Sequence, residues 1–283
     1  AQATNTSTTA VGDGAKATGI SSSAFGQGAN ASNSYAIAAG NGAQATNVYT
    51  SAFGYNAQAT SNNGTAVGAN TTAVGQAFAG GNGAQATGNN SVAVGNGAQS
   101  SDGSATAVGD GAKATGYQSS AIGNGAKASR SNALAVGTSA TATEIYASAF
   151  GSGASAAGQY GTAIGTNAKA NTGSGTAVGG NANAEGDGST AIGGANASTA
   201  QNVTIAGNTV SLTKSAYAKG QQSLAVGYQT QASGADSVAV GTTAVAGNAG
   251  NVAVGHNTIS KGLNTVTLGR DLAAVSYTHL RAH

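Results

Sequence analysis

Few side chains in this 283-residue sequence are of the types that bind metals or act in catalysis. His279 and His283 are four residues apart, which is the spacing at which two histidines on one helix bind zinc. That motif needs a glutamate after its first histidine, but Leu280 stands there, and no third ligand is evident. His256 is isolated and is predicted to be solvated. We therefore expect no metal site.

Glycine-rich phrases are frequent, yet none has the sequence of a phosphate-binding loop. The pattern Gly-x-x-x-x-Gly-Lys-Ser/Thr is absent, and no strand-to-helix context is predicted around the glycines. The Gly-Gly-x-Gly-x-Asp phrase of calcium-binding rolls is also missing, and the repeat described below is not a multiple of the six residues used by acyltransferase solenoids. The sequence therefore predicts a protein that is not an enzyme and holds no cofactor.

Two kinds of side chain recur at equivalent positions and are candidates for contacting a ligand. Lys113 and Lys127 occupy adjacent repeats, which places their backbones about 4.8 Å apart. The alternative is a solvated row of charges that keeps strand edges soluble. Tyrosines recur in two pairs on consecutive repeats, where they either pack as stacked corners or form a contact ridge: Tyr35 with Tyr49, and Tyr146 with Tyr160.

A 14-residue repeat positions these side chains. In each repeat, a small residue, then Ala, then Val, Ile or Phe, then Gly is followed by x-x-Ala-x-Ala. So small a unit cannot bury a hydrophobic face by itself, and nineteen of them predict the stacked coils of a solenoid. One 13-residue step and one 20-residue step interrupt the period. The closing glycines, called motif glycines below, are Gly12, Gly26, Gly40, Gly54, Gly68, Gly81, Gly95, Gly109, Gly123, Gly137, Gly151, Gly165, Gly179, Gly193, Gly207, Gly227, Gly241, Gly255 and Gly269.

The composition agrees with one ordered body over residues 1–272, followed by a tail at 273–283 that abandons the repeat and is predicted to be non-native. Gly is abundant at 47 residues, but Pro is absent and the glycines are periodic, which argues against collagen and disorder. Only 6% of residues are charged and the net charge is +2, so no basic patch exists for nucleic acid. Cysteine is absent, and neither a signal peptide nor a membrane span is recognisable. We expect a fragment that does not itself contact a membrane.

The alternation within each repeat predicts two short strands separated by the motif glycine, taken here as position 0. Bulky residues at −3 and −1, such as Val92 and Val94, are expected to point inward and to meet alanines at +3 and +5 of the second strand. Position +4 is polar and is expected to be solvated. Position −2 is Ala in 17 of 19 repeats, and this uncharged row is predicted to face outward as a homo-oligomer interface. Its predicted interface residues are Ala93, Ala107, Ala121, Ala135, Ala149 and Ala163.

The phrase Asn90-Ser91-Val92-Ala93-Val94-Gly95, echoed at 236–241 and 119–123, closely resembles the head repeat of trimeric autotransporter adhesins, the YadA-like head. The resemblance covers about residues 1–272. It implies an all-β, left-handed parallel β-roll that assembles as a parallel homotrimer on the outer membrane of Gram-negative bacteria. Handedness follows only from the resemblance, because the general crossover preference predicts the opposite hand. The neck, stalk and membrane anchor of that family are not recognisable in this sequence.

The long step between Gly207 and Gly227 is predicted to hold six extra residues within 208–222. A loop on a rigid repeat scaffold is a plausible site of specificity, so its Lys214, Tyr217 and Lys219 are further ligand-contact candidates.

The resemblance favours a non-enzymatic, extracellular adhesin head on the bacterial surface. Its expected partners are other copies of itself and an extracellular matrix protein, a host cell, another bacterium or an abiotic surface. A structural spacer that projects another binding tip is the alternative. An ice-binding solenoid is disfavoured because it requires ranks of Thr-x-Thr, and the rank predicted to face outward here is alanine.

Overall fold

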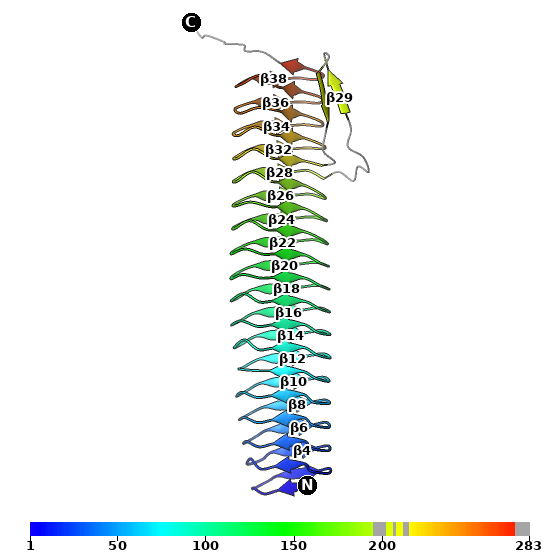
Figure 1. Cartoon of the computed structure of the whole chain (residues 1–283), viewed down its shortest axis with the longest axis vertical. Coiled ribbons are helices and arrows are strands. Elements are labelled where there is room, and N and C mark those ends of the chain that lie inside the picture. The colour runs from blue at the N-terminus through cyan, green and yellow to red at the C-terminus, as the bar shows by residue number, and fades with distance from the viewer. Residues whose placement is uncertain (195–201, 206–207, 212–214, 275–283) are drawn as a thin grey trace. The chain divides into compact units, whose positions relative to one another are not determined.

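The computed structural model describes residues 1–194, 202–205, 208–211 and 215–274. Every regular element in these residues is a β-strand, and no helix occurs among them. The chain divides into two compact units, Ala1–Ser139 (unit 1) and Ala140–His283 (unit 2). Within each unit, two short strands per 14-residue step stack on the strands of the next step, as Figure 1 shows. The predicted β-solenoid and its period are therefore confirmed.

In unit 1, the three-residue strands that end just before the motif glycines pair in parallel in a sheet that we call the motif sheet. Coils pair residue for residue, for example Thr106 with Ser120 and Ala107 with Ala121. The strands are β2 (Thr9–Val11), β4 (Ser23–Phe25), β6 (Ile37–Ala39), β8 (Ser51–Phe53), β10 (Thr65–Val67), β12 (Phe78–Gly80), β14 (Val92–Val94), β16 (Thr106–Val108), β18 (Ser120–Ile122) and β20 (Leu134–Val136).

The second sheet of unit 1, the return sheet, consists of two-residue strands that follow each motif glycine. Its parallel ladder is regular, as in the hydrogen bond from Lys113 N to Ala126 O of 2.8 Å. The strands are β1 (Gln2–Ala3), β3 (Lys16–Ala17), β5 (Asn30–Ala31), β7 (Gln44–Ala45), β9 (Gln58–Ala59), β11 (Thr72–Ala73), β13 (Gln85–Ala86), β15 (Gln99–Ser100), β17 (Lys113–Ala114) and β19 (Lys127–Ala128).

Unit 2 repeats this plan. Its motif sheet contains β22 (Ser148–Phe150), β24 (Thr162–Ile164), β26 (Thr176–Val178), β28 (Thr190–Ile192), β32 (Leu224–Val226), β34 (Val238–Val240), β36 (Val252–Val254) and β38 (Val266–Leu268). Its return sheet contains β21 (Thr141–Ala142), β23 (Ser155–Ala156), β25 (Lys169–Ala170), β27 (Asn183–Ala184), β31 (Tyr217–Ala218), β33 (Gln231–Ala232), β35 (Val245–Ala246), β37 (Ile259–Ser260) and β39 (Ala273–Ala274).

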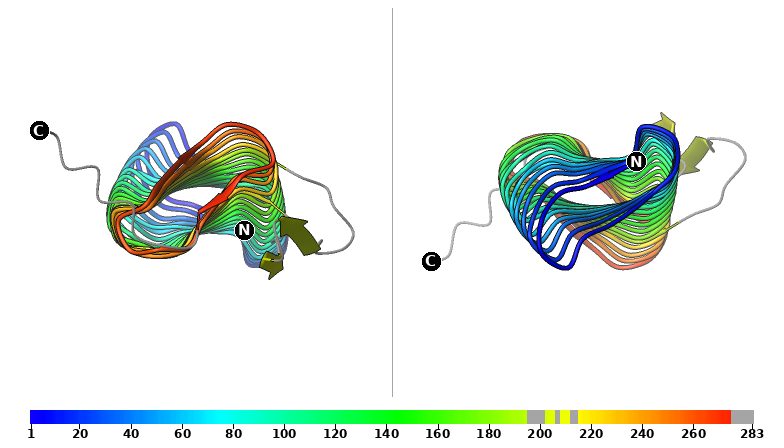
Figure 2. Two further views of the ribbon diagram at one scale, coloured as in Figure 1. Left: turned by 90° about the horizontal axis from the view of Figure 1, so that it is seen from above. Right: turned by 90° about the horizontal axis from the view of Figure 1, so that it is seen from below.

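The count of nineteen coils is wrong, because the described residues form ten motif strands in unit 1 and eight in unit 2. Strand β27 pairs directly with β31, and β28 pairs directly with β32. The 34 residues from Gly193 to Gly227 therefore span one coil plus 20 residues, rather than two coils plus six. Part of the extra chain is an antiparallel hairpin of β29 (Asn202–Ile205) and β30 (Asn208–Ser211), which lies outside the ring of coils of unit 2 (Figure 2).

The core of each unit is a thin layer made mostly of alanine, with Ser and Thr at some positions. Side chains at −4, −2, +3 and +5 point inward, and Ala112, Ala114 and Ala121 are fully buried. Where −4 is Ser or Thr, its hydroxyl usually bonds to the preceding corner, as when Ser119 Oγ donates to Gly116 O at 2.6 Å. Ser22 Oγ and Ser189 Oγ are buried without a hydrogen-bond partner among the described residues. Most of the −4 hydroxyls that enter this core therefore bond to the corner that precedes them.

Candidate functional site

The alanine row at −2 lies inside the coils. The predicted interface residues Ala93, Ala107, Ala121, Ala135, Ala149 and Ala163 are all completely buried within the single chain. The prediction that they face another copy is therefore wrong, and so is the inward direction predicted for −3 and −1. The physical reason is the thinness of the coil: small side chains, mostly alanines, at +3 and +5 already fill most of it, so only another small side chain fits opposite them.

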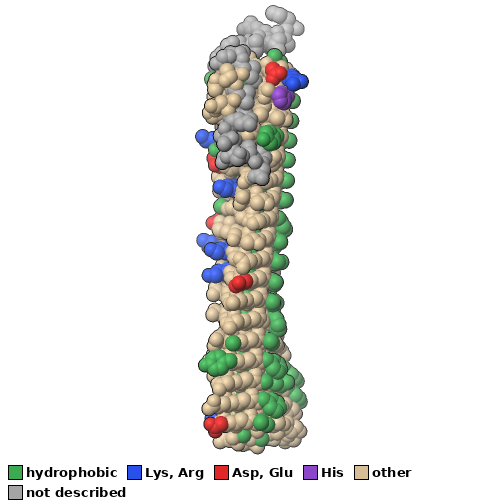
Figure 3. Space-filling model, turned by 90° about the vertical axis from the view of Figure 1, so that its right-hand side faces the viewer, with side chains coloured by type: hydrophobic (Ala, Val, Ile, Leu, Met, Phe, Trp, Pro, Cys, Tyr) green, Lys and Arg blue, Asp and Glu red, His purple; other side chains and the backbone are tan. Residues whose placement is uncertain are grey.

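The bulky residues at −1 and −3 form the outer face of the motif sheet, which we call the apolar face. Its most exposed members in the inner coils range from 36% for Val94 to 44% for Phe25, whereas others, such as Val108 and Val136, are half-buried. Figure 3 shows hydrophobic side chains gathered on the surface of the stacked coils. The members that are more than one-third exposed are Val11, Phe25, Ile37, Phe53, Val67, Phe78, Val94 and Ile122 in unit 1, and Phe150, Ile164, Ile192, Val266 and Leu268 in unit 2.

Side-chain volumes on the apolar face compensate for one another within a coil. Each of the three coils with Phe at −1 has Ser at −3, as in the Ser23 and Phe25 pair. The coil with Phe78 at −3 has Gly80 at −1, and a Cβ on Gly80 would lie only 3.0 Å from Cε1 of the Phe78 ring. Large side chains thus cover the space left by small ones, which keeps this face at an even height. Solvation requires no such evenness, whereas close packing against another surface does.

The lysine candidates lie on the outer surface of the return sheet. Lys113 and Lys127 are register partners in adjacent strands β17 and β19, and both side chains are exposed. The prediction that position +4 is solvated is confirmed for these residues. Neither lysine is ion-paired among the residues that the structure describes, so the row is available to an anionic partner and equally consistent with a solvated edge.

The tyrosine candidates form two stacked pairs. The rings of Tyr35 and Tyr49 have centroids 4.9 Å apart and those of Tyr146 and Tyr160 5.4 Å apart, each pair with an interplanar angle of 6°. All four lie at position −5, at the corner that leads into a motif strand. The structure therefore brings together the partners that the repeat predicted.

The inserted chain supplies an element that the sequence reasoning missed. Val210 of β30 packs against the buried side chains of Val245 and Ile259, which occupy position +4 of two later coils. Gln231 Nε2, at +4 of a third coil, donates to Ser211 O at 3.0 Å. A signal was present in the sequence, because Val245 and Ile259 replace the polar residues found at +4 of most other motif glycines. These side chains become core because the hairpin covers them.

The insertion candidates differ in their placement. Lys214 lies outside the described residues, and Lys219 is exposed beside β31. The Tyr217 hydroxyl donates to Glu185 Oε2, so this hydroxyl is engaged within the chain. Burial, followed by the hydrogen bond to the negatively charged Glu185, raises the pKa of Tyr217 to about 12.

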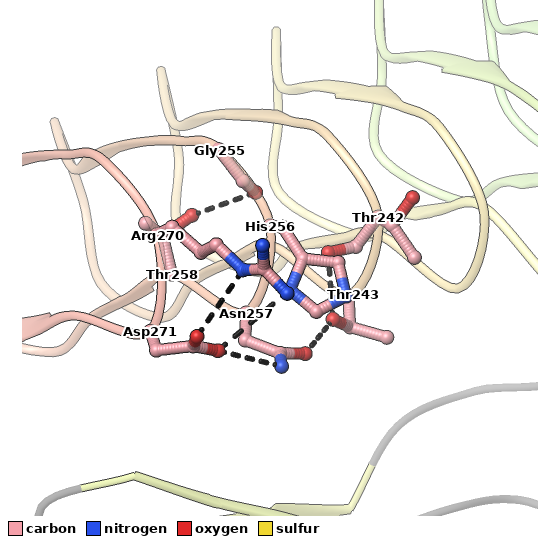
Figure 4. Close-up of polar contacts among 8 residues, drawn as sticks. All are labelled: Thr242, Thr243, Gly255, His256, Asn257, Thr258, Arg270 and Asp271. Carbon is pink, nitrogen blue, oxygen red and sulfur yellow. Dashed lines mark hydrogen bonds and ion pairs between the residues drawn. The ribbon is translucent and has the colours of Figure 1, made fainter.

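A polar network joins the corners of the last coils and is drawn in Figure 4. Asn257 Nδ2 donates to Asp271 Oδ1 at 2.8 Å, and this hydrogen bond lowers the pKa of the Asp271 carboxyl. Arg270 and His256 flank the same carboxylate, with Arg270 Nε 3.3 Å from Oδ2. His256 is solvent-exposed as predicted, but it is not isolated. No group of three potential metal ligands occurs among the described residues, which do not include His279 and His283.

The comparison with protein families identifies the repeat. The family model described as "YadA head domain repeat (2 copies)" matches residues 3–28, 17–43, 45–71, 76–98, 103–126, 114–140, 128–154, 142–168, 156–174, 173–196 and 218–244. Because these matches cover most of the sequence, the chain belongs to the YadA head family, whose members are adhesin-type surface repeat domains. No curated protein sequence matches the chain. No helix in the described residues is long and apolar enough to cross a bilayer.

Proposed function

We propose that the chain is the non-enzymatic head of a bacterial surface adhesin and that it works as a parallel homotrimer of left-handed rolls. Family membership supports the adhesive role and the extracellular location. In this proposal three apolar faces meet at the centre of the trimer, while the return sheets and corners face outward. A matrix protein, a host cell, another bacterium or an abiotic surface is the partner, and an outer-membrane anchor outside this chain holds the head.

The apolar face is the observation on which the trimer rests. Phe25, Phe53 and Phe78 all expose about two-fifths of their surface in the single chain, and they belong to a row that continues through the coils of unit 1. Continuous exposed apolar rows of this kind are unusual on soluble monomers and are typical of interaction surfaces. The volume compensation indicates that the partner surface is regular along the stack. Other copies of the same repeating chain have that regularity.

The assembly is tested by placing a charge on each face of one coil. Ile122→Glu puts a carboxylate on the apolar face, where three copies would meet without water. Lys127→Glu, on the return sheet, is the matched control. We expect the parent and Lys127→Glu to sediment as trimers and Ile122→Glu to dissociate into folded monomers with an unchanged circular dichroism spectrum. A monomeric parent, or a trimeric Ile122→Glu variant with the parental melting temperature, would refute this arrangement.

Adhesion is tested with the intact trimer on immobilised matrix proteins, cultured cells and uncoated plastic. We expect saturable attachment to at least one of these surfaces, which the Ile122→Glu monomer loses because the repeated contacts of three chains are no longer combined. A folded trimer that attaches to none of them would instead support the role of a spacer. The regular low-charge return sheet of unit 1 is compatible with either role.

A further inference from the structure

The stacked tyrosines are exposed aromatic surfaces that the fold does not use. Tyr35 and Tyr49 are 50% and 58% exposed, and Tyr146 and Tyr160 are 52% and 56% exposed. Among the described residues, none forms a hydrogen bond with any of the four hydroxyl groups. Buried tyrosines stabilise a fold through area and a partnered hydroxyl, and these rings contribute little of either.

Their backbone conformation is unfavourable for tyrosine. Tyr35 and Tyr49 have φ values of 59° and 57°, in the left-handed region. Equivalent corners carry residues that adopt this region more readily, such as Asn63, Asn90 and Gly188. The chain therefore retains four strained tyrosines, in two pairs, where Asn or Gly would be more stable. Strain of this kind at an exposed position points to a role in binding rather than folding.

The surroundings of the first pair define the chemistry of a ligand. The corner segments 19–21, 33–35, 47–49 and 61–63 contain no Asp, Glu, Lys or Arg. On the row of −5 positions, the small polar residues Ser21 and Asn63 follow the pair on either side, so no large side chain of this row lies next to the outward ring faces. An aromatic face beside amide and hydroxyl groups suits a ligand that combines a C–H surface with hydroxyl groups and carries no charge.

The size of the corner favours a sugar over a protein. A standard protein interface buries about 800 Å² on each partner, whereas each tyrosine pair projects from a narrow turn. One pyranose ring can stack on one phenol ring, with its hydroxyl groups bonded to the neighbouring amide. Individually weak contacts of this kind gain avidity when a polysaccharide engages several pairs at once.

We propose that the paired-tyrosine corners, Tyr35 with Tyr49 and Tyr146 with Tyr160, bind uncharged polysaccharides of equatorially substituted hexopyranoses, such as β-linked glucans. The first pair is the purer example, since Glu144 lies two residues before Tyr146 at the second. This inference rests on the proposed adhesive function only in placing the head outside the cell. The ligand and the residues that it names do not depend on the proposed adhesive function.

The test measures retention of the full chain on immobilised β-glucan, together with quenching of tyrosine fluorescence by soluble β-glucan oligomers. Tyr35→Asn/Tyr49→Asn should weaken apparent affinity about tenfold, the loss of roughly one aromatic stacking contact, while raising the melting temperature because the strain is relieved. Tyr35→Phe/Tyr49→Phe should retain most of the binding. Tyr55→Ala/Tyr117→Ala is the matched control, because these two tyrosines are similarly exposed but unstacked, and it should bind like the parent.

The possible outcomes separate this inference from the adhesive function. Parental retention of Tyr35→Asn/Tyr49→Asn on β-glucan, or equal losses in the Tyr55→Ala/Tyr117→Ala control, would overturn the inference. Attachment of the parent to matrix protein but not to β-glucan would also overturn it and leave adhesion intact. Heparin and polygalacturonate are negatively charged polysaccharides. Retention on either that equals retention on β-glucan would refute the proposal that the ligand is uncharged. If the parent attaches to no surface of any kind, the adhesive function itself fails.

Discussion

At the scale of single residues, two glycines in the same corner have different roles. Gly109 has φ of +133°, and a Cβ on it would lie 2.5 Å from Gly123 O of the next coil. Gly111 has φ of +64°, but a Cβ there would meet nothing within 4 Å. Gly109 is thus required by the close approach of two backbones, whereas Gly111 is only favoured by its own dihedral angle, which Asn56 and Ser139 adopt at the equivalent position.

We therefore expect Gly109→Ala to lower the free energy of unfolding by more than about 3 kcal/mol, because neighbouring backbones must separate. Gly111→Ala should cost about 1 kcal/mol, the penalty of a left-handed alanine. Urea denaturation followed by circular dichroism measures both. Equal losses in the two variants would contradict this assignment of roles.

A second residue-scale prediction concerns alkaline pH. The pKa of Tyr217 is raised from 10.0 to about 12 in the folded chain, so the folded state holds this proton more tightly than the unfolded state. The resulting stabilisation is fully present below about pH 10 and is lost as pH rises through about 12. Ultraviolet titration of tyrosinate should show one late-ionising group, absent in Tyr217→Phe and shifted to lower pH in Glu185→Gln. Unchanged titration in both variants would argue against the Glu185 contact.

At the scale of elements, the hairpin and the coils it covers form one packing unit. Deleting residues 195–214 removes 20 residues and restores the 14-residue step between Gly193 and Gly227. We expect the coils to persist but Val245 and Ile259 to become exposed, with increased binding of a hydrophobic dye and weaker solubility. Adding Val245→Gln and Ile259→Lys to the deletion should reverse both changes, since these residue types occupy +4 elsewhere. Dye binding that stays at the parental level in the simple deletion would show that the hairpin does not cover this row.

The sequence predicted the positions of the strands better than the directions in which their side chains point. The period located the strands because each coil repeats the same backbone, and the polar +4 row correctly marked an outward face. The directions predicted for the motif-sheet side chains were reversed because Phe25 and Phe53 were assumed to be buried. That rule holds in thick cores but fails where only small side chains fit. The phrase at 203–207 resembles a motif repeat, and its local pattern does not reveal that β29 pairs with β30 instead of with a coil. Pairing between strands, which the local sequence does not reveal, decides whether this segment forms a hairpin or a coil.

At the scale of the whole molecule, stability is expected to be a sum over coils and their contacts with neighbours. Deleting residues 96–109 removes one complete coil and rejoins equivalent positions, so the melting temperature should change by only a few degrees. Deleting residues 96–102, half a coil, brings a return strand where a motif strand must pair and should cause a large loss of stability. Differential scanning calorimetry on the two deletions checks this. Similar melting temperatures would mean that the coils do not depend on their register.

The identical pairing of successive coils also bears on how such a chain can change over generations. Ala107 pairs with Ala121 just as Ala121 pairs with Ala135 in the next strand. A gene segment of 14 codons therefore encodes one complete coil that can be inserted between two others. Unequal recombination between neighbouring repeats would lengthen or shorten the protein without creating a new junction, provided that it keeps to whole multiples of that segment. The motif glycines would select against recombination out of register, because such an exchange places a side chain against the backbone carbonyl of the next coil. Natural variation in this protein should therefore accumulate as coil number more readily than as altered coil design.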